Sequence, residues 1–105
     1  MPEHVAEAVI SRSRGACEAM NPQSCTGLGE HLHHRRMRSQ GGSHEVTNLI
    51  YVCSGCHRWI HEHPKESYKA GWLVRSVHDP SSTPVQYRSR QADLLEDGGI
   101  KIWQN

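Results

Sequence analysis

Histidine is concentrated in one segment of this chain. Seven of the nine histidines and two of the four cysteines lie between Glu30 and Pro64. Imidazole rings bind transition metals and exchange protons near neutral pH, and thiolates bind zinc. A cluster of these residue types therefore predicts metal binding, acid–base chemistry, or both.

The four cysteines form two pairs along the chain. Cys53 and Cys56 form a C-x2-C pair, and Cys17 and Cys25 form a wider C-x7-C pair upstream. Zinc favours four thiolates in a tetrahedron, and C-x2-C is a common half of such a site. The alternatives are two disulfides, four free thiols, or a redox motif. We interpret the four cysteines as a structural zinc site.

Four histidines have the spacing of a reactive site. His57 and His61 are four residues apart, so on a helix they share one face. His33 and His34 are adjacent. We predict that His33, His57 and His61 bind a divalent metal, while His34 stays unligated and accepts a proton from water. A second structural zinc, or surface histidines without a role, are the alternatives. The histidines expected at surface or supporting positions are His4, His31, His44, His63 and His78.

Arginines surround these histidines, although the formal net charge is only +1. Arg35, Arg36 and Arg38 follow the histidine pair, and Arg58 follows His57. We expect these four arginines to hold phosphates, which positions a duplex without reading its bases. A solvated loop is the alternative for the arginine run. No segment resembles a base-reading element, so we expect weak sequence preference.

The central segment must position these side chains. Residues 30–34 ("EHLHH") and 48–52 ("NLIYV") are β-rich and predict two strands joined by a polar loop. Residues 54–63 predict a helix, with Ser54 as its N-cap and Pro64 marking its end. The predicted order is therefore strand, loop, strand, helix.

The flanking segments give weaker signals. Residues 3–14 predict an amphipathic helix that carries Val5, Val9 and Ile10 and ends at Gly15. Residues 17–29 read as a loop.

Beyond the central helix, residues 66–71 read as one or two helical turns and residues 71–77 ("GWLVRSV") as a strand. Residues 78–84 read as a linker. Residues 85–103 read as a hairpin that turns at Asp97-Gly98 or Gly98-Gly99.

Length and composition favour a small stapled domain. The chain has 105 residues, 35% hydrophobic and 6% aromatic residues, and no Phe. One domain over 1–105 is expected, with too few large apolar residues for a thick core, which favours a disulfide or metal staple. No apolar run has the length of a signal peptide or a membrane span, so we expect a cytoplasmic protein that makes no membrane contact.

The stretches "LHHR", "GGSHEVTNLIYVC" and "CSGCHRWIH" resemble the HNH motif of the ββα-metal endonucleases. His34, Asn48 and His57 match the three residues that name the motif. The cysteine pairs resemble the zinc-binding variant among small phage-encoded HNH proteins. The resemblance covers about residues 10–75 and implies a small α+β fold. Its ββα-metal core would span about 15–64, with a C-terminal extension over about 65–105.

The resemblance also implies a function and roles for particular residues. HNH proteins nick or cleave DNA with a metal-activated water, so His34 would be the general base. Many members have Asp where this chain has His33. The site therefore resembles the all-histidine branch of colicin-type nucleases, whose ligands correspond to His33, His57 and His61. Asn48 would brace the loop between the strands, and ligation of the metal is its alternative role.

The sequence alone does not select one metal or one biological setting. Imidazoles suit Zn²⁺, Ni²⁺, Co²⁺ or Mn²⁺, whereas Mg²⁺ prefers oxygen ligands. DNA is the expected partner, together with terminase or other packaging proteins if the chain is phage-encoded and acts in a host cytoplasm. The alternative to a nuclease is a zinc-stapled, non-catalytic DNA-binding or packaging-assembly protein.

Overall fold

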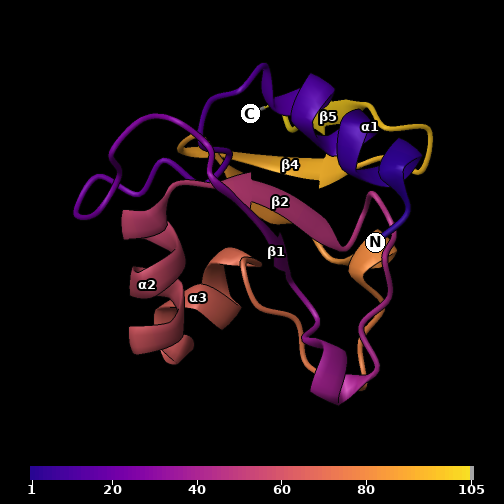
Figure 1. Cartoon of the computed structure of the whole chain (residues 1–105). Coiled ribbons are helices and arrows are strands. Elements are labelled where there is room, and N and C mark those ends of the chain that lie inside the picture. The colour runs from indigo at the N-terminus through magenta and orange to yellow at the C-terminus, as the bar shows by residue number, and fades with distance from the viewer. Residues whose placement is uncertain (105) are drawn as a thin grey trace.

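The histidine-rich segment folds as two strands followed by a helix. The computed structural model describes residues 1–104 (Figure 1). Strand β1 (His31–His34) pairs antiparallel with β2 (Leu49–Val52), and helix α2 (Ser54–Glu62) follows β2. The register places His34 opposite Leu49 and His31 opposite Val52. The predicted strand–loop–strand–helix order is confirmed, and the loop also contains a short 3-10 helix, η1 (Arg38–Gln40).

The ends of α2 differ from the prediction in detail. Ser54 is the first helical residue, and the N-cap is Cys53, whose thiol accepts a hydrogen bond from the Cys56 N–H at 3.2 Å. At the other end, Pro64 both interrupts α2 and begins a further helix, α3 (Pro64–Ala70). Proline suits the first turn of a helix, where its missing N–H would have no partner.

The N-terminal helix α1 (Glu3–Ser13) lies close to the predicted range, but fewer of its apolar side chains are buried than the sequence predicts. Val9 is fully buried, whereas Ile10 is 38% exposed. Successive helix residues are rotated by about 100°, and here the buried face includes Val9 but leaves Ile10 at its edge. The helix ends when Arg14 adopts a left-handed conformation, with φ of 57°, just before Gly15.

A second antiparallel sheet forms the C-terminal part. It contains β3 (Val85–Tyr87), β4 (Arg90–Leu94) and β5 (Ile100–Ile102), in that order. The predicted turn at residues 97–99 joins β4 to β5. A tighter turn joins β3 to β4 through Arg88 and Ser89, whose φ values are 50° and 71°. Neither residue is a usual choice for positive φ, so the sequence did not indicate this second hairpin.

Two predictions for residues 71–84 are wrong. Residues 71–77 form no strand: Trp72 and Leu73 donate their N–H groups to the Ser67 carbonyl and close α3, and Val74 bonds the carbonyl of Arg35 at 2.8 Å. The apolar run thus fills the core from an irregular backbone. Residues 78–84 are more ordered than a linker, because they contain the 3-10 helix η2 (Pro80–Ser82).

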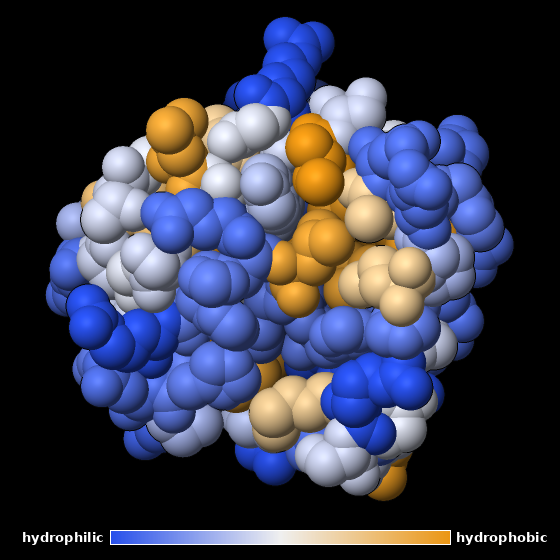
Figure 2. Space-filling model, viewed as in Figure 1, coloured by the Kyte–Doolittle hydropathy of each residue, from blue (hydrophilic) through white to orange (hydrophobic). Residues whose placement is uncertain are grey.

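The core joins both sheets and the cysteines. Its buried residues include Cys17, Cys53 and Cys56 beside Ile50 and Val85. Mean hydropathy is −0.72, and the face in Figure 2 is mostly hydrophilic with a limited apolar area. Among the described residues, no helix combines the length and apolar character needed to cross a bilayer.

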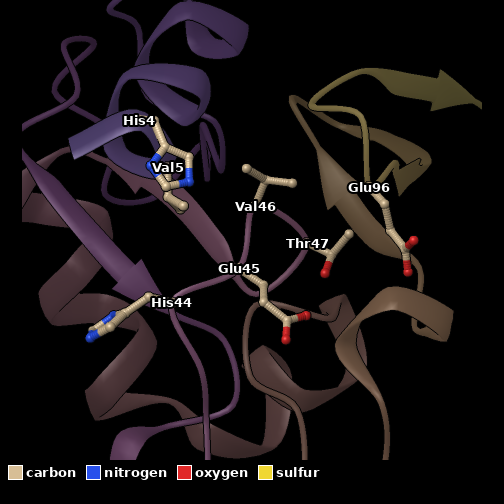
Figure 3. Close-up of a pocket in the computed structure, with 7 residues that line it drawn as sticks. All are labelled: His4, Val5, His44, Glu45, Val46, Thr47 and Glu96. Carbon is tan, nitrogen blue, oxygen red and sulfur yellow. The ribbon is translucent and has the colours of Figure 1, made fainter. Parts of the chain in front are cut away.

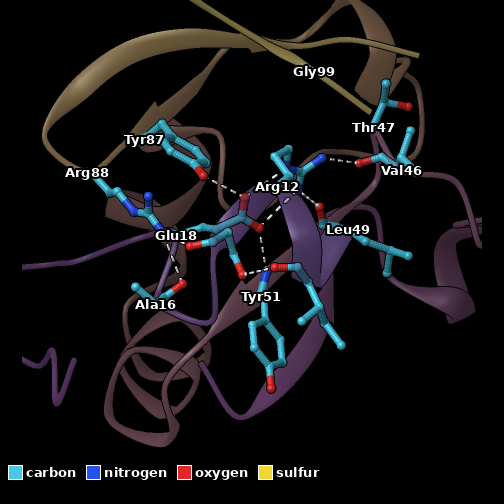
Figure 4. Close-up of polar contacts among 12 residues, drawn as sticks. Arg12, Ala16, Glu18, Val46, Thr47, Leu49, Tyr51, Tyr87, Arg88 and Gly99 are labelled. Atoms are coloured by element: carbon cyan, nitrogen blue, oxygen red, sulfur yellow. Dashed lines mark hydrogen bonds and ion pairs between the residues drawn. The ribbon is translucent and has the colours of Figure 1, made fainter. Parts of the chain in front are cut away.

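A buried carboxylate connects the N-terminal segment to both sheets. Glu18 is 1% exposed and accepts hydrogen bonds from the Arg12 guanidinium at 2.7 and 2.9 Å. It also accepts from the Tyr51 N–H and from the Tyr87 hydroxyl, each at 2.8 Å (Figure 4). A buried charge needs such partners to offset its lost hydration. Glu18 therefore ties α1, β2 and β3 together beside Cys17.

Candidate metal centres

The four cysteine thiols converge from the loop after α1 and from the start of α2. Their sulfur atoms lie within 4.8 Å of one another, and all four are free thiols. Cys17, Cys53 and Cys56 are buried, and Cys25 is partly buried. Thiolates about 2.3 Å from one tetrahedral zinc would lie about 3.8 Å apart, so the donor set fits a zinc ion.

Hydrogen-bond donors already point at three of these sulfurs. The Met20 N–H approaches Cys17 Sγ at 3.4 Å. The N–H groups of Thr26 and Cys56 approach Cys53 Sγ at 3.3 and 3.2 Å, and the Ser24 hydroxyl approaches Cys56 Sγ at 3.3 Å. Burial raises the pKa of Cys53, but hydrogen bonds from the side chain and backbone of Thr26 and from Cys56 outweigh burial and lower the pKa overall. Burial raises the pKa of Cys56. Donors of this kind, which are not ligands themselves, stabilise metal-bound thiolates by hydrogen bonding to their sulfur atoms.

Three imidazoles form a second cluster. The side chains of His33 on β1 and of His57 and His61 on α2 bring their ligand atoms within 4.8 Å of one another. The Nε2 atoms of His57 and His61 are 3.3 Å apart. Two nitrogens bound to one tetrahedral zinc would be about 3.3 Å apart, so this spacing fits a shared metal.

A backbone carbonyl orients His33. Its Nε2–H donates to the carbonyl of Trp72 at 2.8 Å, which leaves Nδ1 as the nitrogen with a free lone pair. His33 is 2% exposed, and burial lowers its pKa to about 3 despite the carbonyl contact. Burial also lowers the pKa of His57, with a further contribution from His61. Both rings are therefore neutral near pH 7, as metal ligands must be.

His34 reaches the same hollow from the last position of β1. The hollow has a volume of about 230 Å³ and is lined by Leu32, His33, His34, Met37, Arg38, His57 and His61. Adjacent residues in a strand point to opposite faces, so His33 turns toward α2 while His34 turns toward the loop. Because β1 ends at His34, both side chains can border one space. Burial lowers the pKa of His34, and neighbouring His44 and Arg38 lower it further.

His44 is the partner that sequence reasoning did not assign to the site. Its Nδ1 lies 3.0 Å from His34 Nε2, and the Arg38 guanidinium donates to its Nε2. Guanidinium has only donors, so neutral His44 carries its proton on Nδ1 and donates it to His34. No residue spacing signals this contact, because it crosses the loop between the strands.

His44 also borders a larger hollow of about 420 Å³. Figure 3 shows His44 and Glu45 projecting from the loop before β2, with Glu96 approaching from the turn after β4. No metal-ligand cluster occurs there among the described residues. The smaller hollow holds the histidine cluster, so size does not identify the candidate site here.

Asn48 holds the loop that carries these groups. It is 1% exposed, and its Oδ1 accepts from the Arg36 N–H at 2.7 Å. Its Nδ2 donates to the carbonyls of Arg36 and Ser43 at 3.1 and 2.9 Å. Gly42 packs so closely that a Cβ there would lie 1.6 Å from the Arg36 carbonyl oxygen. The side chain therefore fixes the loop next to His34.

Two of the four arginines expected at phosphates serve the fold instead. Arg35 is fully buried and donates to the carbonyls of Gly71, Thr47 and Thr83 at 2.7 Å each. Burial lowers its pKa to about 10, so it stays charged. Its assignment to DNA was wrong, because the chain after α3 returns and covers it.

Arg36 is half-buried and donates to the carbonyls of Gly41 and His78 at 3.0 and 3.1 Å. These contacts leave it poorly placed for the phosphate role expected of it. Arg38 in η1 and Arg58 on α2 are exposed. These two arginines remain available to a phosphate.

Comparison with known proteins agrees with this geometry. The family model described as HNH endonuclease matches residues 23–63. No curated protein and no solved structure matches the chain. The matched stretch contains β1, β2 and α2, all three histidines of the cluster, and three of the four cysteines. Residues 23–63 of this chain are therefore similar to the HNH endonuclease family.

Proposed function

We propose that this protein is a metal-dependent DNA endonuclease that hydrolyses phosphodiester bonds with low sequence specificity. An HNH segment supports a nuclease or DNA-binding role in general. The observation that carries the proposal is the histidine cluster with a fourth imidazole, outside the ligand set, on the same hollow. A protein that only binds DNA has no use for such an imidazole.

The chain's own groups divide the work. His33, His57 and His61 would hold a divalent metal, which when bound would stabilise charge on the phosphate and its leaving oxygen. His34 would accept the proton of the attacking water at Nε2, so the water would take the place of the His44 contact on that nitrogen. Until the water arrives, His44 would hold the ring of His34 through the 3.0 Å contact. Neutral imidazole suits the proton transfer, and burial favours the neutral form of His34.

Other residues would hold the substrate and the scaffold. Arg38 borders the histidine hollow and Arg58 is exposed on α2, and both would contact phosphates, which fixes position without base readout. Asn48 would act by holding the loop, since its amide is fully engaged by backbone groups. The cysteines would bind a structural zinc that holds the N-terminal loop to α2.

The metal at the histidines is proposed from ligand chemistry. Three neutral imidazoles favour Zn²⁺, Ni²⁺, Co²⁺ or Mn²⁺ over Mg²⁺. Action in phage DNA packaging or processing, beside a terminase, is the setting that we propose from the sequence resemblance alone.

Cleavage of supercoiled plasmid tests the activity. Protein stripped of exchangeable metal is incubated with plasmid and Mg²⁺, Mn²⁺, Ni²⁺, Co²⁺ or Zn²⁺ in turn. We expect nicked or linear product with at least one metal and none without. Binding of DNA without cleavage in any of the five would favour a zinc-stapled DNA-binding protein.

A further inference from the structure

Residues 75–78 form an exposed loop beside the histidine site without belonging to it. Arg36 lies two residues after His34, and its guanidinium donates to the carbonyls of Ser76 and His78 at 3.5 and 3.1 Å. Arg36 is itself bonded through its backbone to Asn48. The loop is therefore held at a fixed distance from the end of β1.

Arg75 in this loop differs from the arginines that brace the fold. Its guanidinium lies 4.5 Å from the centre of the Tyr68 ring, and Tyr68 accepts a hydrogen bond from Gln40 of η1 at 3.5 Å. Within residues 1–104, the Arg75 side chain makes no hydrogen bond or ion pair. Stacking on an aromatic face orients the guanidinium and leaves its N–H donors free.

The surface around Arg75 is mixed in character. A hollow of about 160 Å³ is lined by Tyr68, Leu73, Val74, Arg75, His78 and Thr83. At the tip of the loop, the side chain of Val77 is 82% exposed. The nearby carboxylate of Asp79 accepts from the N–H and hydroxyl of Ser81, which turns it toward η2. A free cation, a histidine and an exposed apolar side chain thus share one short loop.

We propose that this loop is a second contact for the DNA backbone, with Arg75 on a phosphate and Val77 against the neighbouring deoxyribose. The proposal rests on the proposed function, because it takes DNA as the substrate. Phosphates alternate with apolar sugar faces along a strand, and free guanidinium donors match phosphate oxygens. Because Arg36 ties the loop to β1, this contact would set where the strand lies relative to His34.

Salt-dependent binding of a labelled duplex tests this contact. Binding is followed by fluorescence anisotropy over a range of salt concentrations, in buffer without added divalent metal. Arg75→Ala should weaken binding about three- to tenfold and lower the slope of log K against log salt by about 0.9, the value for one phosphate. Arg75→Lys should keep the wild-type slope, because the charge remains.

Two further variants separate the contact from general effects. Val77→Ser should weaken binding about twofold with an unchanged slope, because a sugar contact releases no counterion. Arg90→Ala, which removes an exposed arginine from β4, should leave both affinity and slope at wild-type values. Melting temperatures of all four variants should match the wild type, since none of these side chains is buried.

The outcomes distinguish this proposal from the function on which it rests. Wild-type protein that binds the duplex while Arg75→Ala keeps the full slope would overturn the loop contact alone. Wild-type protein that binds no duplex would overturn both proposals. If inorganic phosphate shifts the Tyr68 ring signals in NMR but Arg75→Ala leaves duplex binding unchanged, the loop takes small anions and the DNA contact is wrong.

Discussion

The cysteine cluster and the histidine cluster share helix α2 but offer a metal different surroundings. Cys53 caps the helix and Cys56 lies in its first turn, while His57 and His61 follow on the same helix. Three of the four cysteines are fully buried, whereas His61 is exposed and His57 is half-buried. Four thiols complete a tetrahedron, but three imidazoles leave a position open toward a hollow.

Under the proposed function, this difference separates a site for stability from a site for chemistry. Structural zinc sites are closed, whereas catalytic sites keep one position for water or substrate. The supports differ in the same way. The cysteines lie within the core, so we expect the fold around them to depend on a bound ion. The histidines are held by hydrogen bonds within the protein: His33 donates to the carbonyl of Trp72, and His44 donates to His34.

Loss of a cysteine should have the largest effect. Cys56→Ser removes one of four ligands from a buried site, and metal binding of this kind is coupled to folding. We expect loss of bound zinc and failure to fold at ordinary temperatures, measured by elemental analysis and circular dichroism. His61→Ala, on the same helix, is the control and should melt close to the wild type. If Cys56→Ser kept the wild-type melting temperature and zinc content, the four cysteines would not be a structural zinc site.

Chelation should empty the two clusters at different concentrations. Mild treatment with a chelator should remove metal from the histidines but leave about one zinc per chain on the four thiolates. Stronger chelation should unfold the protein. Elemental analysis and melting curves along the same chelator series follow both events. Complete removal of zinc with an intact fold would contradict this order.

Substitutions of His34 and His57 should affect different properties: the first the cleavage rate, the second metal binding. His34→Ala should lower the cleavage rate about a hundredfold to ten-thousandfold, the usual contribution of a general base, while metal and DNA still bind. His57→Ala should abolish metal binding at this site, because it removes a direct ligand. Single-turnover cleavage and calorimetric metal titration give the two readouts. Wild-type cleavage by His34→Ala would mean that another group is the base.

The clusters could be predicted from the sequence because their spacing is local. C-x2-C at a helix start and His57 with His61 one turn apart follow from helix geometry alone. The burial of Arg35 could not be predicted, because its acceptors Gly71 and Thr83 lie far along the chain.

Tertiary packing also explains why the His44 contact and the irregular backbone of residues 71–77 were not predicted. His44 meets His34 only because the loop between the strands folds back. Residues 71–77 have the composition of a strand, yet they find no strand partner and pack as irregular chain against the core. In each case contacts far apart in the sequence override local preference.

Arg35 offers a test of how the histidine region is supported. Arg35→Met keeps much of the volume but leaves the carbonyls of Gly71, Thr47 and Thr83 without their buried donor. Hydrogen bonds to charged groups contribute about 1.5–3 kcal/mol each, and they are not additive, so we expect a loss of about 3 kcal/mol. Urea unfolding measures it, with exposed Arg58→Ala as the control. Equal stability of the two variants would show that Arg35 is not a support.

Substitution of Asn48 should have the smallest effect on stability. It tests most directly whether the histidine region, unlike the cysteine region, is stable without its metal. Asn48→Ala leaves the N–H and carbonyl of Arg36 and the carbonyl of Ser43 without their side-chain partner. Unsatisfied buried groups cost about 1–3 kcal/mol, so unfolding in urea should show a loss in that range. Because protein hydrogen bonds hold this loop, the loss should be the same whether or not the histidine metal is present. Asn48→Asp keeps an acceptor for the Arg36 N–H but turns a buried carboxylate oxygen toward the carbonyls of Arg36 and Ser43, so its stability should fall below that of Asn48→Ala. If added metal restored Asn48→Ala to wild-type stability, Asn48 would act through the metal, and the histidine region would depend on its ion as the cysteine region does.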